Sequence, residues 1–203
     1  MQKVLEVNDL QKVRETSLFN PVSFSLGAGE GLGLYGHNGC GKTTLLDIIA
    51  GLQKHNSGEI NLNASIGYVM QHDGFQDNLS CKDNLMIEAA ICGLKGEAAR
   101  NRIDYCAALC EVLPYWKKKI SKCSAGMRAR VALAAAFMSN PGLLLLDEAF
   151  NTLDFNTVQL MKRTLSEKKK EGMALLLVSH DKEDFPGLCE RVLYLPSAEI
   201  STI

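Results

Sequence analysis

Short apolar runs rich in β-branched residues alternate with turn residues over the first 71 positions of the chain. This pattern predicts short strands that are interrupted by a single helix. The helix is expected to begin at Gly41 and end near Ala50, and Gly51 follows it as a residue suited to the backbone at a helix end. The strands are expected at Val4–Val7, Val22–Leu26, Gly31–Tyr35, Glu59–Leu62 and Ile66–Met70.

The apolar spacing changes to a helical period between Asp77 and Asn140. Ser80 and Asp83 form a capping box, a pattern that satisfies the free N–H groups at the start of a helix. Helices are therefore expected over Asn84–Gly93, Glu97–Val112 and Gly126–Ser139.

Strand and helix patterns alternate again in the last third of the chain. Because strands stand at both ends and helices in the middle, the chain is expected to form one α/β core with an inserted helical subdomain. The expected elements are a strand over Leu143–Leu146, a helix over Thr157–Lys169, and strands over Ala174–Ser179 and Arg191–Leu195.

The segment Gly36–Thr43 matches the phosphate-binding pattern G-x-x-x-x-G-K-[ST] at every fixed position, between a predicted strand and a predicted helix. Its glycines let backbone N–H groups point inward around an anion, and the helix N-terminus adds partial positive charge. Lys42 would contact the β- and γ-phosphates, and the Thr43 hydroxyl would ligate Mg²⁺. The expected nucleotide-binding residues are Gly36, His37, Asn38, Gly39, Cys40, Gly41, Lys42, Thr43 and Thr44.

Four consecutive leucines, Leu143–Leu146, lead into Asp147 and Glu148. Such a run is typical of a parallel strand that is covered on both faces. Asp147, at the carboxyl end of this strand, is expected to ligate Mg²⁺, and Glu148 is expected to be the general base that polarises the attacking water. Beside a complete phosphate-binding loop, this interpretation is favoured over a strand that simply ends in solvated acids.

Composition excludes several other classes of protein. The chain has 203 residues with 22 Lys+Arg against 23 Asp+Glu, and this balance argues against a protein that coats nucleic acid. No apolar run approaches the roughly 20 residues that cross a bilayer, and the first residues lack the apolar segment of a signal peptide. A cytoplasmic protein without direct membrane insertion is expected. The seven cysteines form no CxxC pair, so reduced and mostly buried thiols are expected.

Further motifs follow in a fixed order along the chain. Gln71 ends a strand just before the helical segment, Ser124-Ala125-Gly126 opens an Ala-rich helix, Asp154 follows Glu148, and His180 follows the strand that ends at Ser179. With these motifs, the chain resembles the ATP-binding-cassette (ABC) ATPases over nearly its whole length.

The resemblance implies a RecA-like P-loop NTPase core with a small antiparallel β region and an inserted α-helical subdomain. It implies a single ABC ATPase domain over residues 1–203. Within it, residues 1–76 and 140–203 would form the nucleotide-binding core, and residues 77–139 the helical subdomain with the family's signature motif.

The resemblance also implies roles for individual residues. Glu148 corresponds to the catalytic glutamate, His180 to the switch histidine, and Gln71 to the Q-loop glutamine that ligates Mg²⁺ or its water together with Thr43 and Asp147. The signature residues Ser124, Ala125 and Gly126, with Asp154 of the D-loop, would contact the nucleotide held by the opposite subunit. Taken singly, His180 and Gln71 are more often structural residues, so their roles depend on the order of the motifs.

Two positions depart from the family pattern. Where the family usually offers an aromatic ring to stack on adenine, this chain offers Arg14, whose guanidinium can also stack on a base. Met127 replaces the glutamine that usually ends the signature, which removes one polar contact. Neither change removes a catalytic group.

The implied function is that of an ATP-binding and ATP-hydrolysing transporter subunit, with ATP and Mg²⁺ as cofactors. ATP would close a homodimer or heterodimer of cassettes, and hydrolysis would reopen it. These movements would drive a separate transmembrane permease that holds the chain at the cytoplasmic face of the membrane. The surface from Gln71 to Leu85, with Phe75, is the expected docking groove.

The pattern S-x-G-M-[RK]-x-R over Ser124–Arg130 resembles bacterial exporters, so export is favoured over import. Two alternatives remain open from the sequence. One is a soluble ABC ATPase that acts in translation, on DNA or in Fe–S assembly. The other is a regulatory binding module with feeble hydrolysis.

Overall fold

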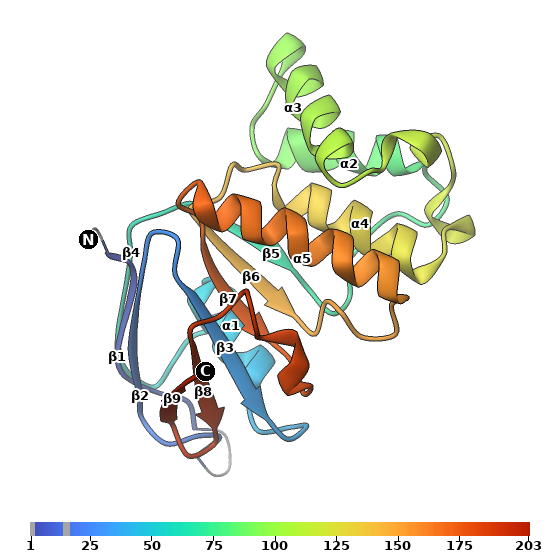
Figure 1. Cartoon of the computed structure of the whole chain (residues 1–203). Coiled ribbons are helices and arrows are strands. Elements are labelled where there is room, and N and C mark those ends of the chain that lie inside the picture. The colour runs from blue at the N-terminus through green and yellow to red at the C-terminus, as the bar shows by residue number, and fades with distance from the viewer. Residues whose placement is uncertain (1–2, 14–16) are drawn as a thin grey trace.

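The computed structural model describes residues 3–13 and 17–203, so Arg14 lies outside the described residues. Figure 1 shows a core of strands flanked by helices, with a group of helices set to one side. The strands are β1 Lys3–Gln11, β2 Val22–Gly27, β3 Gly31–Gly36, β4 Ser57–Leu62, β5 Ile66–Val69, β6 Leu143–Asp147, β7 Ala174–Val178, β8 Arg191–Leu195 and β9 Glu199–Thr202. The helices are α1 Lys42–Ile49, α2 Cys81–Ile91, α3 Gly96–Leu109, α4 Ala125–Ala136 and α5 Phe155–Lys170, with short 3₁₀ turns at Leu113–Tyr115, Ile120–Lys122 and Lys182–Asp184.

The larger sheet has six strands in the order β5-β6-β7-β3-β8-β9, and all its pairs are parallel except β8–β9. Asp147 pairs with Val178, and Leu34 pairs with that same residue from the other side. The carboxyl ends of β3, β6 and β7 therefore lie next to one another. In parallel α/β sheets this edge is where ligands bind.

Helices cover both faces of the larger sheet, and the central strands β6 and β7 are buried at every position. Leu144 and Leu146 of β6 belong to one core cluster with Met161 of α5. Leu143 and Leu145 of the same strand belong to a second cluster with Leu46 of α1. Successive side chains of a strand point to opposite faces, so the leucine run fills both layers at once. The expected strand buried on both faces is confirmed.

The smaller sheet is antiparallel, in the order β2-β1-β4. β1 extends to Gln11, beyond the expected Val7, since its second half still pairs with β2 through Leu10 and Val22. β9 was not predicted, and its four residues are all exposed. An edge strand with no buried face has no hydrophobic alternation to reveal it.

The helices α2 and α3 lie at the top of Figure 1, and α4 lies between them and α5. Both bonds of the expected capping box are present, because Ser80 Oγ accepts from Asp83 N at 3.1 Å and Asp83 Oδ2 accepts from Ser80 N at 3.2 Å. α2 therefore begins at Cys81, three residues before the expected Asn84. The fold is the predicted P-loop core with an inserted helical subdomain, whereas the limits at residues 77 and 139 stay a prediction.

The described residues bear on two predictions, one about membrane crossing and one about the cysteines. Within them, no helix combines the length and the apolar character that a bilayer crossing needs. All seven cysteines are free thiols, and only Cys92 and Cys123 are less than fully buried.

Candidate nucleotide-binding site

The phosphate-binding loop turns sharply between β3 and α1. Gly39 and Gly41 have left-handed φ angles of 82° and 100°, which L side chains rarely adopt. A Cβ atom on Gly41 would also lie 2.8 Å from the ring of Phe19. The loop therefore needs glycine at these positions, and α1 starts directly after it at Lys42.

The Lys42 side chain is folded back over this loop and is only 5% exposed. Its Nζ donates hydrogen bonds to Gly36 O at 2.7 Å and to His37 O at 3.1 Å, and lies 3.9 Å from Glu148 Oε1. A buried ammonium requires such partners. Its charge is thereby held at the loop where phosphate oxygens would lie.

Thr43 and Asp147 meet across the loop and the sheet. Thr43 Oγ1 donates to Asp147 Oδ2 at 2.7 Å, whereas Asp147 Oδ1 is buried without a hydrogen-bond partner among the described residues. Burial raises the pKa of the Asp147 carboxyl, and the Thr43 hydrogen bond opposes this shift. An orphaned carboxylate oxygen beside a hydroxyl is the donor set that Mg²⁺ takes, together with nucleotide phosphates. The residues present therefore fit this ion.

Glu148 is held over the loop by an uncommon backbone conformation, with φ of 51°. Its Oε2 accepts a hydrogen bond from Asn151 Nδ2 at 2.6 Å and lies 3.7 Å from Nδ1 of His180. Left-handed φ at a non-glycine residue costs free energy and is tolerated where the surroundings impose it. The Asn151 contact was not predicted from the sequence, since a side-chain amide three residues away gives no pattern.

A cavity of about 310 Å³ brings eight of the predicted site residues together. Gln71 and Glu148 line it together with residues of the phosphate-binding loop. Its lining consists of Leu18, Asn38, Gly39, Gly41, Lys42, Thr43, Thr44, Gln71 and Glu148. Asp147 joins them through Thr43, and His180 through Glu148.

Ser124, Gly126 and Asp154 gather in a different place. Ser124 Oγ caps α4 by accepting from Met127 N at 3.2 Å, and Asp154 caps α5 by accepting from Thr157 N at 3.0 Å. The hydrogen bonds from Thr157 lower the pKa of the Asp154 carboxyl. A Cβ atom on Gly126 would lie 2.7 Å from Thr157 Oγ1, so the start of α4 is pressed against the start of α5.

These signature residues line their own hollow. Ser124 and Asp154 border a depression of about 650 Å³ that shares no lining residue with the cavity at the phosphate-binding loop. Ala125 instead lines a third hollow of about 470 Å³, together with Gln71 and Glu148. One chain thus carries two separate polar faces, each with part of the predicted nucleotide contacts.

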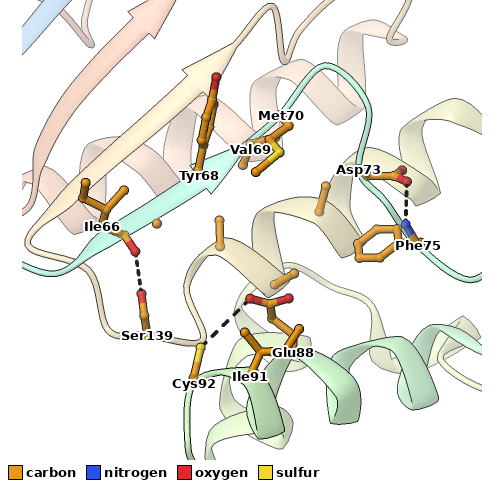
Figure 2. Close-up of a pocket in the computed structure, with 14 residues that line it drawn as sticks. Ile66, Tyr68, Val69, Met70, Asp73, Phe75, Glu88, Ile91, Cys92 and Ser139 are labelled. Carbon is orange, nitrogen blue, oxygen red and sulfur yellow. Dashed lines mark hydrogen bonds between the residues drawn. The ribbon is translucent and has the colours of Figure 1, made fainter. Parts of the chain in front are cut away.

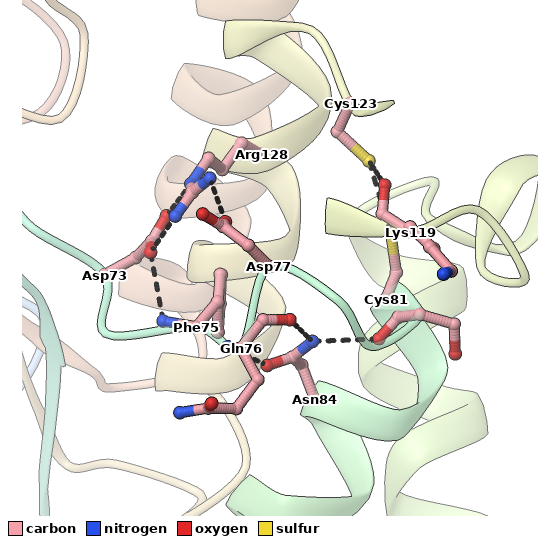
Figure 3. Close-up of polar contacts among 10 residues, drawn as sticks. Asp73, Phe75, Gln76, Asp77, Cys81, Asn84, Lys119, Cys123 and Arg128 are labelled. Atoms are coloured by element: carbon pink, nitrogen blue, oxygen red, sulfur yellow. Dashed lines mark hydrogen bonds and ion pairs between the residues drawn. The ribbon is translucent and has the colours of Figure 1, made fainter. Parts of the chain in front are cut away.

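An ion-pair cluster that the sequence did not predict links the segment after Gln71 to helix α4 (Figure 3). The Arg128 guanidinium of α4 donates two hydrogen bonds to the Asp73 carboxylate, one from Nε and one from Nη2 at 2.8 Å. Its Nη1 donates a third to Asp77 Oδ1 at 2.8 Å. Asp73 follows Gln71 by two residues, and Arg128 follows Ser124 by four. The cluster therefore ties the segment after Gln71 to the helix that Ser124 begins.

Replacing Arg128 by alanine is expected to lower kcat for ATP hydrolysis by at most about fivefold, since a partly exposed ion pair contributes up to about 1 kcal/mol. The Michaelis constant for ATP should change little, because Arg128 does not line the cavity at the phosphate-binding loop. Steady-state phosphate release measures both constants. Arg128→Lys keeps the charge without the two-pronged geometry and should fall between the two proteins. A raised Michaelis constant with an unchanged kcat would contradict the role of Arg128 as a link between the segment after Gln71 and α4.

An apolar groove of about 330 Å³ runs between β5, α2 and α4 (Figure 2). Met70 and Phe75 lie along it, and Ile91 at its rim is 73% exposed. Glu88 is the half-buried carboxyl in its wall, and burial raises the pKa of that group. The expected docking segment from Gln71 to Leu85 borders this groove at Asp73 and Phe75.

The comparisons with known proteins agree with this geometry. The family model described as "ABC transporter" matches residues 19–151. An uncharacterized ABC transporter ATP-binding protein of Methanocaldococcus jannaschii is 33% identical over 196 residues, which cover 96% of this chain and 75% of that protein. A solved ATP-binding cassette, a dimer in a post-hydrolysis state with ADP and phosphate, superposes with a TM-score of 0.87 at 23% identity and covers 98% of both chains.

Two relatives carry names of opposite transport direction. The teichoic acids export ATP-binding protein TagH of Lactococcus lactis is 30% identical, and the match covers 88% of this chain but only 38% of that protein. The spermidine/putrescine import ATP-binding protein PotA of Bacillus cereus is 27% identical over 100% of this chain and 66% of that protein.

Proposed function

Because the chain belongs to the ABC transporter family as an ATP-binding, ATP-hydrolysing subunit, we propose that it powers export through a separate transmembrane subunit. The observation that carries the ATP-hydrolysing part of this proposal is the convergence of Lys42, Thr43, Gln71 and Glu148 on one cavity at the carboxyl edge of the parallel sheet. This arrangement offers a cation, a hydroxyl ligand, an amide and a carboxylate to one triphosphate.

Hydrolysis would proceed through groups of this chain that would surround the γ-phosphate of bound ATP. Lys42 would exchange its carbonyl partners for β- and γ-phosphate oxygens. Glu148 would accept the proton of the attacking water at a carboxylate oxygen, with Asn151 holding that carboxylate in place. His180, 3.7 Å from Glu148, would donate a hydrogen bond to the γ-phosphate.

Mg²⁺ would be held by Thr43 and Asp147, with Gln71 as a further ligand directly or through water, and would neutralise charge on the β- and γ-phosphates. The unpartnered Asp147 Oδ1 supports this assignment. Because burial already disfavours the charge on Asp147, a nearby cation would stabilise its ionised form.

Two cassettes would complete two sites. The hollow that holds Ser124 and Asp154 shares no residue with the cavity at the phosphate-binding loop, so neither face alone surrounds a nucleotide. In a head-to-tail pair, the Ser124 face of each subunit would cover the loop of the other, with the N-terminus of α4 toward the phosphates. The partner would be a second copy or a homologous cassette.

The transmembrane subunit would dock on the apolar groove beside Phe75. Met70, three residues from Asp73, and Ile91 present exposed apolar surface there. The Arg128 cluster would carry movement of this segment to α4. The name of TagH and the S-x-G-M-[RK]-x-R pattern support export, although the import name of PotA shows that direction does not follow from family membership alone.

The docking proposal can be tested by co-purification with the product of a neighbouring gene for a multi-spanning membrane protein. Ile91→Glu is expected to abolish the complex, because a charge would be buried in an apolar contact, and to leave basal ATPase activity unchanged. Ile87→Glu is the matched control, since Ile87 is an exposed residue of α2 outside the groove. Equal binding by Ile91→Glu and wild type, or co-purification with ribosomes alone, would contradict the proposal.

A further inference from the structure

Two cysteines from distant parts of the chain lie side by side in the helical subdomain. Cys81 is the first residue of α2, and Cys123 directly precedes Ser124. Their Sγ atoms are 3.5 Å apart, although the residues are separated by 42 positions. No other pair of cysteines in the described residues shows such a contact. Figure 3 labels both residues, near Lys119.

The backbone around these cysteines fixes their relative position. Cys81 N donates to Lys118 O at 2.9 Å, and Ile120 N donates to Leu79 O at 3.0 Å. The thiols are held by the same short segment, because Cys81 Sγ donates to Lys118 O at 3.3 Å and Cys123 Sγ to Lys119 O at 3.5 Å. Both sulfurs are therefore positioned by several hydrogen bonds to the segment 118–120.

We propose that Cys81 and Cys123 are a redox modification site that closes reversibly to a disulfide. A disulfide needs an S–S distance of about 2.05 Å, so the two sulfurs must approach by about 1.5 Å. Cys123 is partly exposed and can be reached by an oxidant, whereas Cys81 is fully buried. Cys123 is thus the thiol that reacts with the oxidant, and Cys81 is the thiol that forms the disulfide with oxidised Cys123.

A peroxide is the class of oxidant that the site would take. The Cys123 thiolate attacks one peroxide oxygen, the O–O bond breaks, and sulfenic acid and water form once the second oxygen gains a proton. The Cys81 sulfur then attacks the Cys123 sulfur and displaces the hydroxyl group, which leaves as water with the proton of the Cys81 thiol. Two thiols and one hydrogen peroxide therefore give one disulfide and two waters.

There is a physical reason why Cys123 reacts with the peroxide first and Cys81 reacts second. Burial and the contact with Cys123 raise the pKa of the Cys81 thiol to about 12. A thiol that remains protonated reacts poorly with peroxide in solution. Once Cys123 carries a sulfenic acid, the Sγ atom of Cys81 is held 3.5 Å from its sulfur, and this proximity offsets the small thiolate fraction of Cys81.

Closing this bond would displace the start of the signature helix. Cys123 is bonded covalently to Ser124, whose Oγ caps α4 through Met127 N. Drawing Cys123 toward α2 would shift Ser124 away from the position at which it contacts the partner's nucleotide. This consequence for hydrolysis rests on the proposed role of Ser124, whereas the disulfide itself does not.

The site can be tested on the full chain by oxidation with hydrogen peroxide followed by tryptic mapping without reduction. Trypsin releases Cys81 in the peptide 55–82 and Cys123 in the peptide 123–128. We expect these two peptides to be linked and two thiols per chain to be lost. ATPase activity should fall by about tenfold or more, since a displacement near 1 Å of a contact residue can cost that much, and dithiothreitol should restore it.

Cys81→Ser and Cys92→Ser separate this site from the other thiols. Cys81→Ser should have wild-type activity before oxidation and keep it afterwards, whereas Cys92→Ser should respond like wild type. Absence of the linked peptide would overturn the proposed site. A linked peptide without loss of activity, or an equal loss in Cys81→Ser, would overturn its regulatory role. Wild-type activity measured before oxidation tests the proposed function separately.

Discussion

Replacing Lys42 by alanine is expected to weaken ATP binding by about 100-fold and to abolish measurable hydrolysis. The Lys42 ammonium is buried at the phosphate-binding loop, where it would contact two phosphate groups. Charge-assisted hydrogen bonds contribute about 1.5–3 kcal/mol each, and the loss of about 3 kcal/mol lowers an affinity about 100-fold. Titration of the purified protein with a fluorescent ATP analogue measures this loss directly.

Lys170→Ala is the matched control for this variant. Lys170 is an exposed residue at the end of α5 and belongs to no described ion pair. The Lys170→Ala protein should bind ATP with the affinity of the wild type. Circular dichroism must show that Lys42→Ala is folded, since the removed ammonium also bonds the carbonyl groups of Gly36 and His37. A folded Lys42→Ala protein with wild-type affinity would show that the phosphates bind elsewhere.

Replacing Glu148 by glutamine is expected to lower the rate of ATP hydrolysis by at least about 100-fold while ATP binding is retained. A general base contributes about 10²- to 10⁴-fold to a rate, and an amide cannot accept the proton of water. Glutamine has the same shape, so the contact with Asn151 and the backbone conformation at position 148 can persist. Single-turnover phosphate release, with ATP bound beforehand, separates this chemical step from binding.

Glu171→Gln is a matched control, because Glu171 is exposed and its one ion pair within the described residues is with Lys168 at the end of α5. It should hydrolyse ATP at the wild-type rate. If Glu148→Gln also hydrolysed ATP at that rate, the proton would have to pass to another group, and His180 beside Glu148 would be the next candidate.

The sequence predicted those parts of the site that depend on local pattern. The phosphate-binding loop, the leucine strand before Asp147 and the capping box at Ser80 each combine residue types at short, fixed spacings, and each forms as expected. The order of parallel strands then places Gly36, Asp147 and Ser179 at one edge of the sheet, since β3, β7 and β6 are adjacent.

Contacts between distant segments could not be predicted. Arg128 meets Asp73 and Asp77 over more than 50 residues of sequence, and nothing in the spacing distinguishes it from a solvated arginine. The consecutive residues Ser124 and Ala125 also line different hollows. Ala125 borders the hollow with Gln71 and Glu148, whereas Ser124 borders the hollow with Asp154. Successive residues of a helix point in different directions, and only the packing of α4 decides where.

The central claim is that two cassettes close around ATP, with the Ser124 face of one chain covering the phosphate-binding loop of the other. The most direct measurement is the mass of the Glu148→Gln protein by size-exclusion chromatography with light scattering in saturating MgATP. The account predicts a particle of twice the 22.2 kDa of one chain, which reverts to a single chain when ATP is removed. A protein that binds MgATP and remains a single chain of 22.2 kDa would contradict it.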